Sequence, residues 1–276
     1  MPTTIPSPGS ELPTAAQLDA VIDIARRAGR EILDVYGTDF QATAKADASP
    51  LTQADLRAHR LIVDALAALQ PSLPVLSEES ADIPFAERSS WQRYWLVDPL
   101  DGTKEFVSRN GEFTVNIALI DRHRPVLGVV HIPVVDTTYS GIPGAGAWRE
   151  ANDRGRLPIG VRRVARPPWR VVGSRSHGNP AMQQALDALG PHELKTAGSS
   201  IKLCMVAEGS ADLYPRLGPT SEWDIAAGQA VIEAAGGQVV RLADGLALRY
   251  NSKDEVLNPD FLAYGDPECF RRWPRG

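Results

Sequence analysis

The sequence contains few cysteines and histidines, and their positions exclude several kinds of site. Its 276 residues include 2 cysteines, Cys204 and Cys269, and neither belongs to a C-x-x-C motif. Two isolated thiols provide no disulfide framework, and the apolar neighbours of Cys204 predict a buried side chain. The 5 histidines are scattered, without the spacing of H-E-x-x-H or of a cysteine and histidine cluster. We therefore expect no zinc site.

Long apolar runs and a surplus of basic residues are also missing. No run approaches the roughly 20 residues that cross a bilayer, and residues 1–11 lack the basic and apolar parts of a signal peptide. Lys and Arg number 29 against 34 Asp and Glu, whereas nucleic-acid binders usually carry a basic surplus. We expect a cytoplasmic protein with no nucleic-acid partner and no integral membrane segment. Peripheral membrane association and the oligomeric state are left open, with a monomer favoured.

The residues that are present predict alternating helices and strands. Hydrophobic residues make up 43% of the chain and charged residues 23%, which fits a folded chain with a large core. A capping box of Thr14 and Gln17 predicts a helix that Gly37 ends, and a second helix begins near Thr52 and ends before Pro71. Further helices are expected near 182–189, 201–208 and 224–235. Strands are expected at 75–76, 95–97, 113–120, 126–132, 171–172 and 212–214, with short strands finishing the chain. The predicted class is mixed α/β.

One segment is the best candidate for a boundary within the chain. Residues 162–168 read Arg-Arg-Val-Ala-Arg-Pro-Pro, and prolines punctuate secondary structure. We expect a flexible N-terminal tail at 1–12, an N-terminal α+β half at 13–165 and a C-terminal α/β half at 166–276.

The stretch from Trp95 to Thr103 carries the strongest chemical signal. An apolar strand runs into Asp98-Pro99-Leu100-Asp101-Gly102-Thr103, and α/β proteins place their chemistry in loops at strand ends. Two carboxylates this close repel one another unless a cation lies between them, and Mg²⁺ prefers such oxygen ligands. Gly102 permits close approach of a phosphate to the backbone. A surface turn explains this stretch equally well when it is taken alone.

Two further acidic segments favour a site over a turn. Glu78 and Glu79 follow another apolar strand, and Asp224 lies at the start of an apolar helix. Each has a plain alternative, since Glu78 and Glu79 could form a solvated turn and acids stabilise helix N-termini.

These motifs, taken in order, resemble the inositol monophosphatase superfamily of lithium-sensitive phosphatases. The resemblance rests on Glu78-Glu79, on Asp98-x-x-Asp101-Gly102-Thr103 and on Trp223-Asp224. Within the superfamily the chain is most similar to the 3′(2′),5′-bisphosphate nucleotidases. That similarity rests on segments 49–55, 174–177, 198–202, 213–220 and 257–259, and it covers nearly the whole chain after the first dozen residues. It implies a layered α-β-α-β-α sandwich of the inositol monophosphatase and sugar phosphatase type.

The resemblance also implies which residues bind metal and which act on water. The metal ligands are Glu78, Asp98, Asp101, Asp224 and the main-chain carbonyl of Leu100, holding two or three Mg²⁺ ions. The residues that activate water are Thr103 and Asp55. The spacing Thr52-x-x-Asp55 is also that of a helix capping pair, so Asp55 has a structural explanation as well.

Substrate binding follows from the same resemblance. The implied contacts to a phosphorylated nucleotide are Glu78, Leu100, Asp101, Gly102, Thr103, Ser174, His177, Gly198, Ser199, Ser200, Lys202 and Asp224. Each of two residues also has a purely structural explanation: Lys202 could lie on a solvated helix face, and His177 could be a loop histidine that caps the following helix. The expected reaction is hydrolysis of 3′-phosphoadenosine 5′-phosphate to AMP and phosphate, which is linked to sulfur assimilation.

Three alternatives stand beside this expectation. The same chemistry could act on an inositol phosphate or on fructose bisphosphate. A haloacid-dehalogenase-type phosphatase has the motif D-x-D-G-T, but here the spacing is D-x-x-D, one residue longer, and its mechanism would form a phospho-aspartate. A non-catalytic protein that binds metal or nucleotide is the third alternative.

Overall fold

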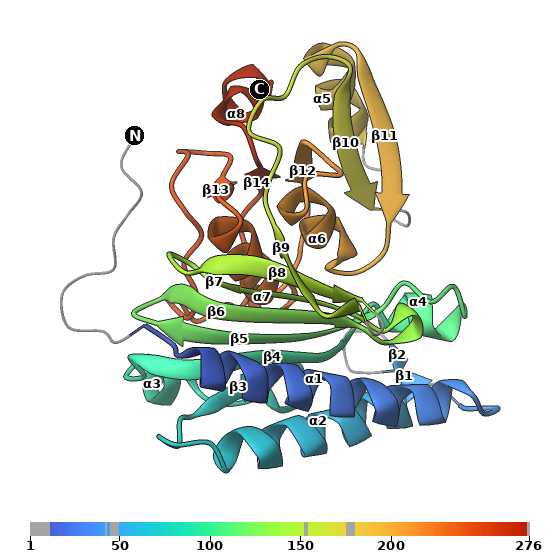
Figure 1. Ribbon diagram of the computed structural model, residues 1–276, viewed down its shortest axis with the longest axis vertical. Helices are drawn as coiled ribbons and strands as arrows, with labels where there is room; N and C mark the ends of the chain where they lie inside the picture. The colour runs from blue at the N-terminus through green and yellow to red at the C-terminus, as the bar shows by residue number, and fades with distance from the viewer. Residues whose placement is uncertain (1–11, 42, 45–49, 152–153, 175–179, 275–276) are drawn as a thin grey trace.

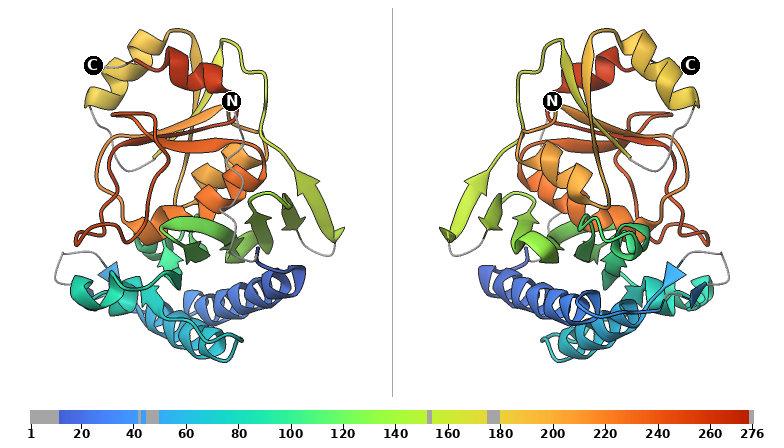
Figure 2. Two further views of the ribbon diagram at one scale, coloured as in Figure 1. Left: turned by 90° about the vertical axis from the view of Figure 1, so that its left-hand side faces the viewer. Right: turned by 90° about the vertical axis from the view of Figure 1, so that its right-hand side faces the viewer.

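The protein is described by a computed structural model over residues 12–41, 43–44, 50–151, 154–174 and 180–274. Over these residues the chain forms five layers in the order helices, sheet, helices, sheet, helices (Figure 1, Figure 2). The expected α-β-α-β-α sandwich is therefore confirmed.

The first outer layer consists of α1 (Ala15–Tyr36) and α2 (Gln53–Ala67). The apolar stripe of α1 and the buried side of α2 pack together on one face of a seven-stranded sheet. Both helices begin with the capping boxes that the sequence indicated, at Thr14 and at Thr52. The strands of this sheet, in spatial order, are β3 (Val75–Ser77), β4 (Arg93–Asp101), β5 (Thr114–Asp121), β6 (Arg124–Ile132), β7 (Thr137–Ile142), β8 (Gly146–Ala151) and β9 (Arg156–Ile159).

The middle layer is formed by α6 (Ile201–Ala207) and α7 (Glu222–Ala234), which lie between the two sheets. Small residues let α7 approach the seven-stranded sheet very closely. A Cβ added to Gly128 of β6 would lie 2.2 Å from the carbonyl oxygen of Ala227, and one added to Gly141 of β7 would lie 2.9 Å from the Cα of Val231. This close packing fixes the start of α7, and with it Asp224, against β4.

The second sheet and its outer helices complete the sandwich. In spatial order its strands are β11 (His192–Ala197), β10 (Trp169–Ser174), β12 (Leu213–Arg216), β14 (Phe261–Tyr264) and β13 (Gln238–Arg241). The outer face packs against α5 (Pro180–Leu189) and α8 (Pro267–Arg272). The chain passes from the first sheet to the second between β9 and β10, over residues 160–168. The division into two halves near residue 165 stays a prediction.

Most predicted elements are found, and several elements were missed. Strand β11 was not predicted because four of its six residues are exposed, so it has no apolar alternation. The short helices α3 (Phe85–Arg88) and α4 (Thr103–Val107) were also missed. The short strands expected after α7 are found as β13 and β14, but the last element is the helix α8, with Pro267 in its first turn and Asp266 as its N-cap. Two two-residue strands, β1 (Thr43–Ala44) and β2 (Pro50–Leu51), pair with each other.

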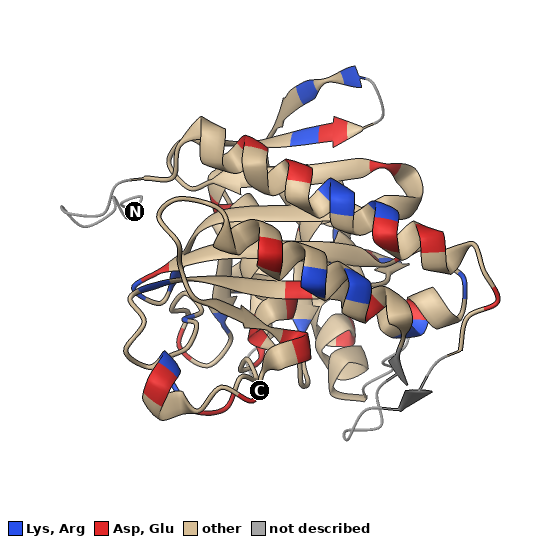
Figure 3. Ribbon diagram, turned by 90° about the horizontal axis from the view of Figure 1, so that it is seen from below, with Lys and Arg blue, Asp and Glu red and all other residues tan. Residues whose placement is uncertain are grey.

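The surface formed by α1 and α2 carries both signs of charge interspersed (Figure 3). This face therefore presents no continuous basic stripe of the kind that tracks a nucleic-acid backbone. None of the helices in the part of the chain that the structure describes combines the length and the apolar character of a membrane span.

Candidate active site

Two acidic residues lie at the end of β4, where the strand leaves regular pairing. The register between β4 and β5 shifts between Asp98 and Asp101, the stretch that contains Pro99. The main-chain N–H of Leu100 donates to Asp98 Oδ1 at 3.0 Å, which closes a tight turn. Gly102 has φ +90°, in the left-handed region that favours glycine, and precedes α4. The turn thus directs both carboxylates to one side of the sheet.

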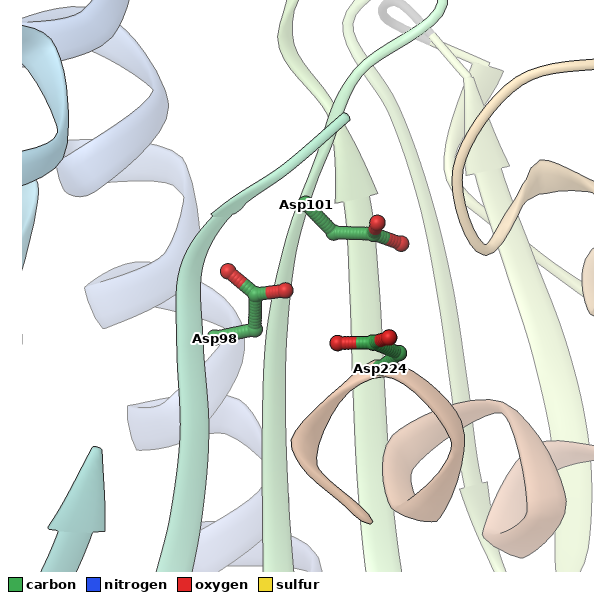
Figure 4. A group of neighbouring side chains, drawn as sticks. All are labelled: Asp98, Asp101 and Asp224. Atoms are coloured by element: carbon green, nitrogen blue, oxygen red, sulfur yellow. The ribbon is translucent and has the colours of Figure 1, made fainter. Parts of the chain in front are cut away.

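Asp224 completes a cluster of three carboxylates. Oxygen atoms of Asp98, Asp101 and Asp224 all lie within 4.8 Å of one another. Figure 4 shows the three side chains pointing toward a common centre, two from β4 and one from the first turn of α7. No lysine or arginine among the described residues forms an ion pair with any of the three. Three clustered carboxylates without a cationic partner fit a divalent metal site.

The electrostatics of the cluster agree with that assignment. Burial, followed by the nearby carboxylates of Glu78, Asp101 and Asp224, raises the pKa of Asp98 well above its usual range. Burial and the charge of Asp101 raise the pKa of Asp224 to about 7. In the protein without metal, these groups therefore resist ionisation together, and a bound cation would relieve the repulsion.

Glu78 lies at the edge of this cluster. It begins the short 3₁₀-helix η1 (Glu78–Ser80) directly after β3, and its side chain lines the same cleft as the three aspartates. Its carboxylate is close enough to Asp98 to raise the pKa of that residue by charge and by a hydrogen bond. Strand β3 pairs in parallel with β4, so both strands deliver their acids to the same end of the sheet.

Asp101 is held by a set of neutral donors. Its Oδ2 atom lies 2.7 Å from Ser199 Oγ and 2.8 Å from Ser200 Oγ, and Asn116 Nδ2 donates to it at 3.3 Å. The Ser200 hydroxyl also lies 2.6 Å from the main-chain oxygen of Asp224. These bonds fix the orientation of Asp101 and link β4, β5 and α7 without adding charge.

Asp55 and Thr103 form the second chemical feature. Asp55 is 1% exposed, and its Oδ2 atom accepts from the main-chain N–H and the hydroxyl of Thr52, at 2.8 and 2.6 Å. Its other oxygen lies 3.4 Å from Thr103 Oγ1, which is also 3.3 Å from the Leu100 carbonyl oxygen. Asp55 therefore caps α2 with one oxygen and contacts Thr103 at the start of α4 with the other, so the two explanations of this residue are compatible.

A cleft of about 260 Å³ lies over the cluster. Most of the residues expected from the sequence line it, namely Glu78, Asp98, Leu100, Asp101, Gly102, Thr103, Ser174, Ser199, Ser200, Lys202 and Asp224. Gly198 lies behind its wall, where the glycine amide donates to Glu112 Oε2 at 2.7 Å. A Cβ at Gly198 would lie 2.7 Å from Glu105 Cγ, so this glycine permits close packing. His177 lies outside the described residues.

Three cationic residues line the cleft, and they differ in their bonding. Lys202 is 5% exposed, and its ammonium group donates to the carbonyl oxygens of Ala197 and Ser199 at 3.2 and 2.6 Å. Burial lowers the pKa of Lys202 to about 8. Arg216, on β12, donates to the carbonyl oxygen of Pro219 at 2.5 Å, and its buried Nε atom has no partner among the described residues. Lys104 is exposed at the start of α4.

Sequence reasoning missed several residues of the site. Arg216, Lys104 and Tyr214 line the cleft but were not named as site residues. The polar residues Thr114 and Asn116 are fully buried in β5 beside Asp101. The sequence could have indicated them, because Thr114 and Asn116 lie two residues apart at the start of a strand that continues with apolar residues.

The raised pKa values predict how metal and pH affect stability. A raised carboxyl pKa means that the folded protein binds more protons than the unfolded chain, here between about pH 4, the unfolded value, and about pH 7. The free energy of unfolding of the metal-free protein therefore falls as the pH rises through this window. Mg²⁺ should offset the loss, so the rise in Tm on adding Mg²⁺ should be larger at about pH 8 than at about pH 5.5. Equal rises at both pH values in thermal unfolding would contradict this assignment.

The fold and the site together define a class of protein. An acidic cluster with an adjoining hydroxyl and carboxylate, set in an α-β-α-β-α sandwich, is the arrangement of a metal-dependent phosphatase. Residues 15–265 match the model of the inositol monophosphatase family, and the chain belongs to this family. Its enzymes use divalent metals. The fold sets aside the haloacid-dehalogenase alternative.

Individual relatives give a finer comparison. The chain is 52% identical to the 3′(2′),5′-bisphosphate nucleotidase CysQ of Shigella flexneri over 252 residues, 88% of this chain and 98% of the relative. The CysQ of Escherichia coli K12 is 52% identical over 247 residues, again 88% of this chain and 98% of the relative. The crystal structure of CysQ from Bacteroides thetaiotaomicron superposes with a TM-score of 0.80 at 42% identity, covering 91% of this chain and 97% of that one. The SuhB protein of Bartonella henselae superposes with a TM-score of 0.77 at 26% identity, covering 95% and 100%.

Proposed function

We propose that the protein is a Mg²⁺-dependent 3′(2′),5′-bisphosphate nucleotidase that converts 3′-phosphoadenosine 5′-phosphate to AMP and phosphate. The observation that carries this proposal is the cluster of Asp98, Asp101 and Asp224 beneath the cleft, next to the pair of Asp55 and Thr103. The names of the relatives at 52% identity support the substrate. The reaction would connect the protein to sulfur metabolism.

The residues present fit the metal that the family uses. Asp98, Asp101, Asp224 and Glu78 would hold two or three Mg²⁺ ions, together with the carbonyl oxygen of Leu100. When bound, such ions neutralise phosphate charge and lower the pKa of water. The chain contributes a rigid set of ligands, since Leu100 N, Ser199, Ser200 and Thr220 hold the carboxylates in place.

The Thr103 hydroxyl and Asp55 would orient the attacking water and take its proton. Thr103 can accept a hydrogen bond from water while it donates to Asp55 Oδ1, 3.4 Å away. Asp55 is fixed through its other oxygen by Thr52, which holds Oδ1 toward Thr103. Positioned proton acceptors of this kind contribute on the order of a hundredfold to ten-thousandfold in rate.

The surroundings of the cleft favour a nucleotide over a simple sugar phosphate. A second cavity of about 330 Å³ adjoins the cleft and shares Ser174, Tyr214 and Arg216 with it. Its walls are largely apolar, with Val171, Leu186 and Leu194 among them. An apolar cavity beside a few polar groups suits the nucleobase of a nucleotide whose phosphate lies in the cleft.

A substrate panel tests the proposed function. Phosphate release is measured for 3′-phosphoadenosine 5′-phosphate, inositol 1-phosphate and fructose 1,6-bisphosphate at equal enzyme and Mg²⁺ concentrations. We expect the nucleotide to have the highest kcat/KM. A higher value for either sugar phosphate would overturn the proposed substrate, and no turnover of any member would overturn the enzymatic assignment. The monomeric state and the cytoplasmic location stay predictions.

The cations of the cleft give a sharper prediction. Arg216 lines both cavities and carries a permanent positive charge, so we expect its guanidinium group to bind the phosphate that is not hydrolysed. Charge-assisted hydrogen bonds contribute about 1.5–3 kcal/mol, so Arg216→Ala should lower kcat/KM for the bisphosphate by about tenfold to a hundredfold and barely affect inositol 1-phosphate, if that substrate is turned over.

Lys202 retains one N–H and its charge for substrate, but it also fixes the 197–199 main chain behind Ser199. Lys202→Ala should therefore lower kcat/KM for both substrates. An equal loss on both substrates for Arg216→Ala would contradict its selective role.

A further inference from the structure

Residues 251–258, which we call the strap, form part of the connection between β13 and β14 and do not line the cleft. The last residue of the strap belongs to the Leu257-Asn258-Pro259 motif, which no step of the proposed reaction uses. Asn258 is 9% exposed. Its main-chain N–H donates to the carbonyl oxygen of Thr220 and its Nδ2 atom donates to that of Ser221, both at 2.8 Å. Asn258 thus holds two consecutive residues at once.

Those two residues are the donors that orient Asp224. Thr220 Oγ1 lies 2.7 Å from Asp224 Oδ2, and the main-chain N–H of Ser221 donates to the same oxygen at 3.0 Å. One carboxylate oxygen is therefore fixed by the segment that Asn258 fixes. A rotation of residues 220–221 would rotate the Asp224 carboxylate away from Asp98 and Asp101.

The other end of the strap is anchored by buried polar groups. The main-chain N–H of Asn251 donates to Glu222 Oε2 at 2.7 Å, two residues before Asp224. The Asn251 amide exchanges hydrogen bonds with Arg88, whose Nη1 lies 2.5 Å from Asn251 Oδ1 and whose carbonyl oxygen lies 2.6 Å from Asn251 Nδ2. Burying a carboxylate, a guanidinium and an amide together costs free energy unless their geometry is fixed. The strap is therefore rigid at both ends, and both ends meet the first turn of α7.

We propose that Asn258 is a positioning residue that sets the orientation of Asp224 in the metal site, with Asn251 anchoring the strap that carries it. The inference rests on the metal site of the proposed function. Residues that orient metal ligands typically change metal affinity or activity by about tenfold to a hundredfold when replaced, because the ligand set must then be ordered during binding.

The test measures Mg²⁺ binding rather than turnover. Isothermal titration calorimetry with Mg²⁺ compares the wild type, Asn258→Ala and a control, Leu189→Ala, which removes buried apolar contacts in the outer core around α5. We expect Asn258→Ala to weaken Mg²⁺ binding by about tenfold to a hundredfold, while kcat at saturating Mg²⁺ stays within about threefold of the wild-type value. Leu189→Ala should lower Tm without changing Mg²⁺ affinity.

Two outcomes would overturn the inference. One is wild-type Mg²⁺ affinity in Asn258→Ala with only a lower Tm, and the other is an equal loss of affinity in Leu189→Ala. If Asn258→Ala does not fold, Asn251→Gly decides the question. Asn251 has φ +53°, which glycine adopts readily, and the variant keeps the bond to Glu222 while removing the amide pair with Arg88. It should weaken Mg²⁺ binding in the same direction, and unchanged affinity would overturn the proposal. A wild type that binds Mg²⁺ but hydrolyses no member of the substrate panel would overturn the proposed function alone.

Discussion

Asp98→Asn is expected to lower kcat/KM for 3′-phosphoadenosine 5′-phosphate by about a thousandfold or more, which corresponds to at least about 4 kcal/mol of transition-state stabilisation. Asp98 is 1% exposed and lies among Glu78, Asp101 and Asp224. The negative charge of Asp98 is therefore repelled by three neighbouring carboxylates, and a bound cation would balance that repulsion. Without this charge, the site would lose a negative metal ligand, so Mg²⁺ affinity should fall together with turnover.

The same variant should fold normally, which separates a chemical effect from a structural one. Asparagine has the shape of aspartate, and its Oδ1 atom can still accept from the main-chain N–H of Leu100. Because burial and repulsion raise the pKa of Asp98, the neutral amide removes a folding penalty at neutral pH. The Tm of the metal-free variant should equal or exceed that of the wild type.

A partly buried carboxylate outside the cluster provides the matched control. Glu233 lies near the other end of α7 and accepts from Gln229 Nε2 at 2.7 Å. Glu233→Gln should retain activity within about threefold and should bind Mg²⁺ as the wild type does. Circular dichroism, calorimetry with Mg²⁺ and phosphate release are measured for both variants. Turnover near the wild-type rate in Asp98→Asn would exclude this carboxylate as a metal ligand.

The fold could be predicted where local signals and burial agree. The capping boxes at Thr14 and Thr52 define helix starts through side chains only three residues apart, so they are legible in the sequence. Strands β4, β5 and β6 are buried on both faces and read as apolar runs. By contrast, β11 exists because its backbone pairs with β10 along six residues. Its side chains are mostly exposed and polar, so the sequence does not show the pairing.

The site could be predicted only in part, for a related reason. The acids of β4 are neighbours in the sequence, and Glu78 and Asp224 stand out at the end of a strand and the start of a helix, but only the family resemblance joined them into one metal site. The bonds that orient these acids come from residues distant in the chain, such as Ser199 to Asp101 and Asn258 to the residues that bind Asp224. Those contacts depend on the packing of α7 against Gly128 of β6, so they cannot be predicted from a local sequence pattern.

Asp55→Asn is expected to lower kcat by about a hundredfold to ten-thousandfold without weakening Mg²⁺ binding. Among the described residues, Asp55 is not one of the clustered carboxylates, and it contacts the site through Thr103 Oγ1 at 3.4 Å. Asparagine can still accept from the main-chain N–H of Thr52 and so keep the cap of α2. It cannot take a proton from the Thr103 hydroxyl. The variant therefore separates capping from proton transfer, which the spacing of Thr52 and Asp55 alone leaves open.

The capping box of α1 is the matched control, because it has the same bonds with no site beside it. Gln17 Oε1 accepts from the main-chain N–H of Thr14 at 3.0 Å. Gln17→Ala removes this one hydrogen bond, so it should cost about 0.5–1.5 kcal/mol of stability and leave kcat unchanged. If Asp55→Asn also leaves kcat unchanged, then the role of Asp55 is capping alone.

Thr103 completes the argument, because the two residues should act as one unit. Thr103→Val keeps the shape of the side chain and removes the hydroxyl, so it should lower kcat by a factor similar to that of Asp55→Asn. Thr103→Ser keeps the hydroxyl and should retain most of the activity. The double variant of Asp55→Asn and Thr103→Val should be little slower than either single variant, since removing one member already breaks the path of the proton. Multiplied losses in the double variant would show that the two side chains act independently, and the proton would then need another acceptor.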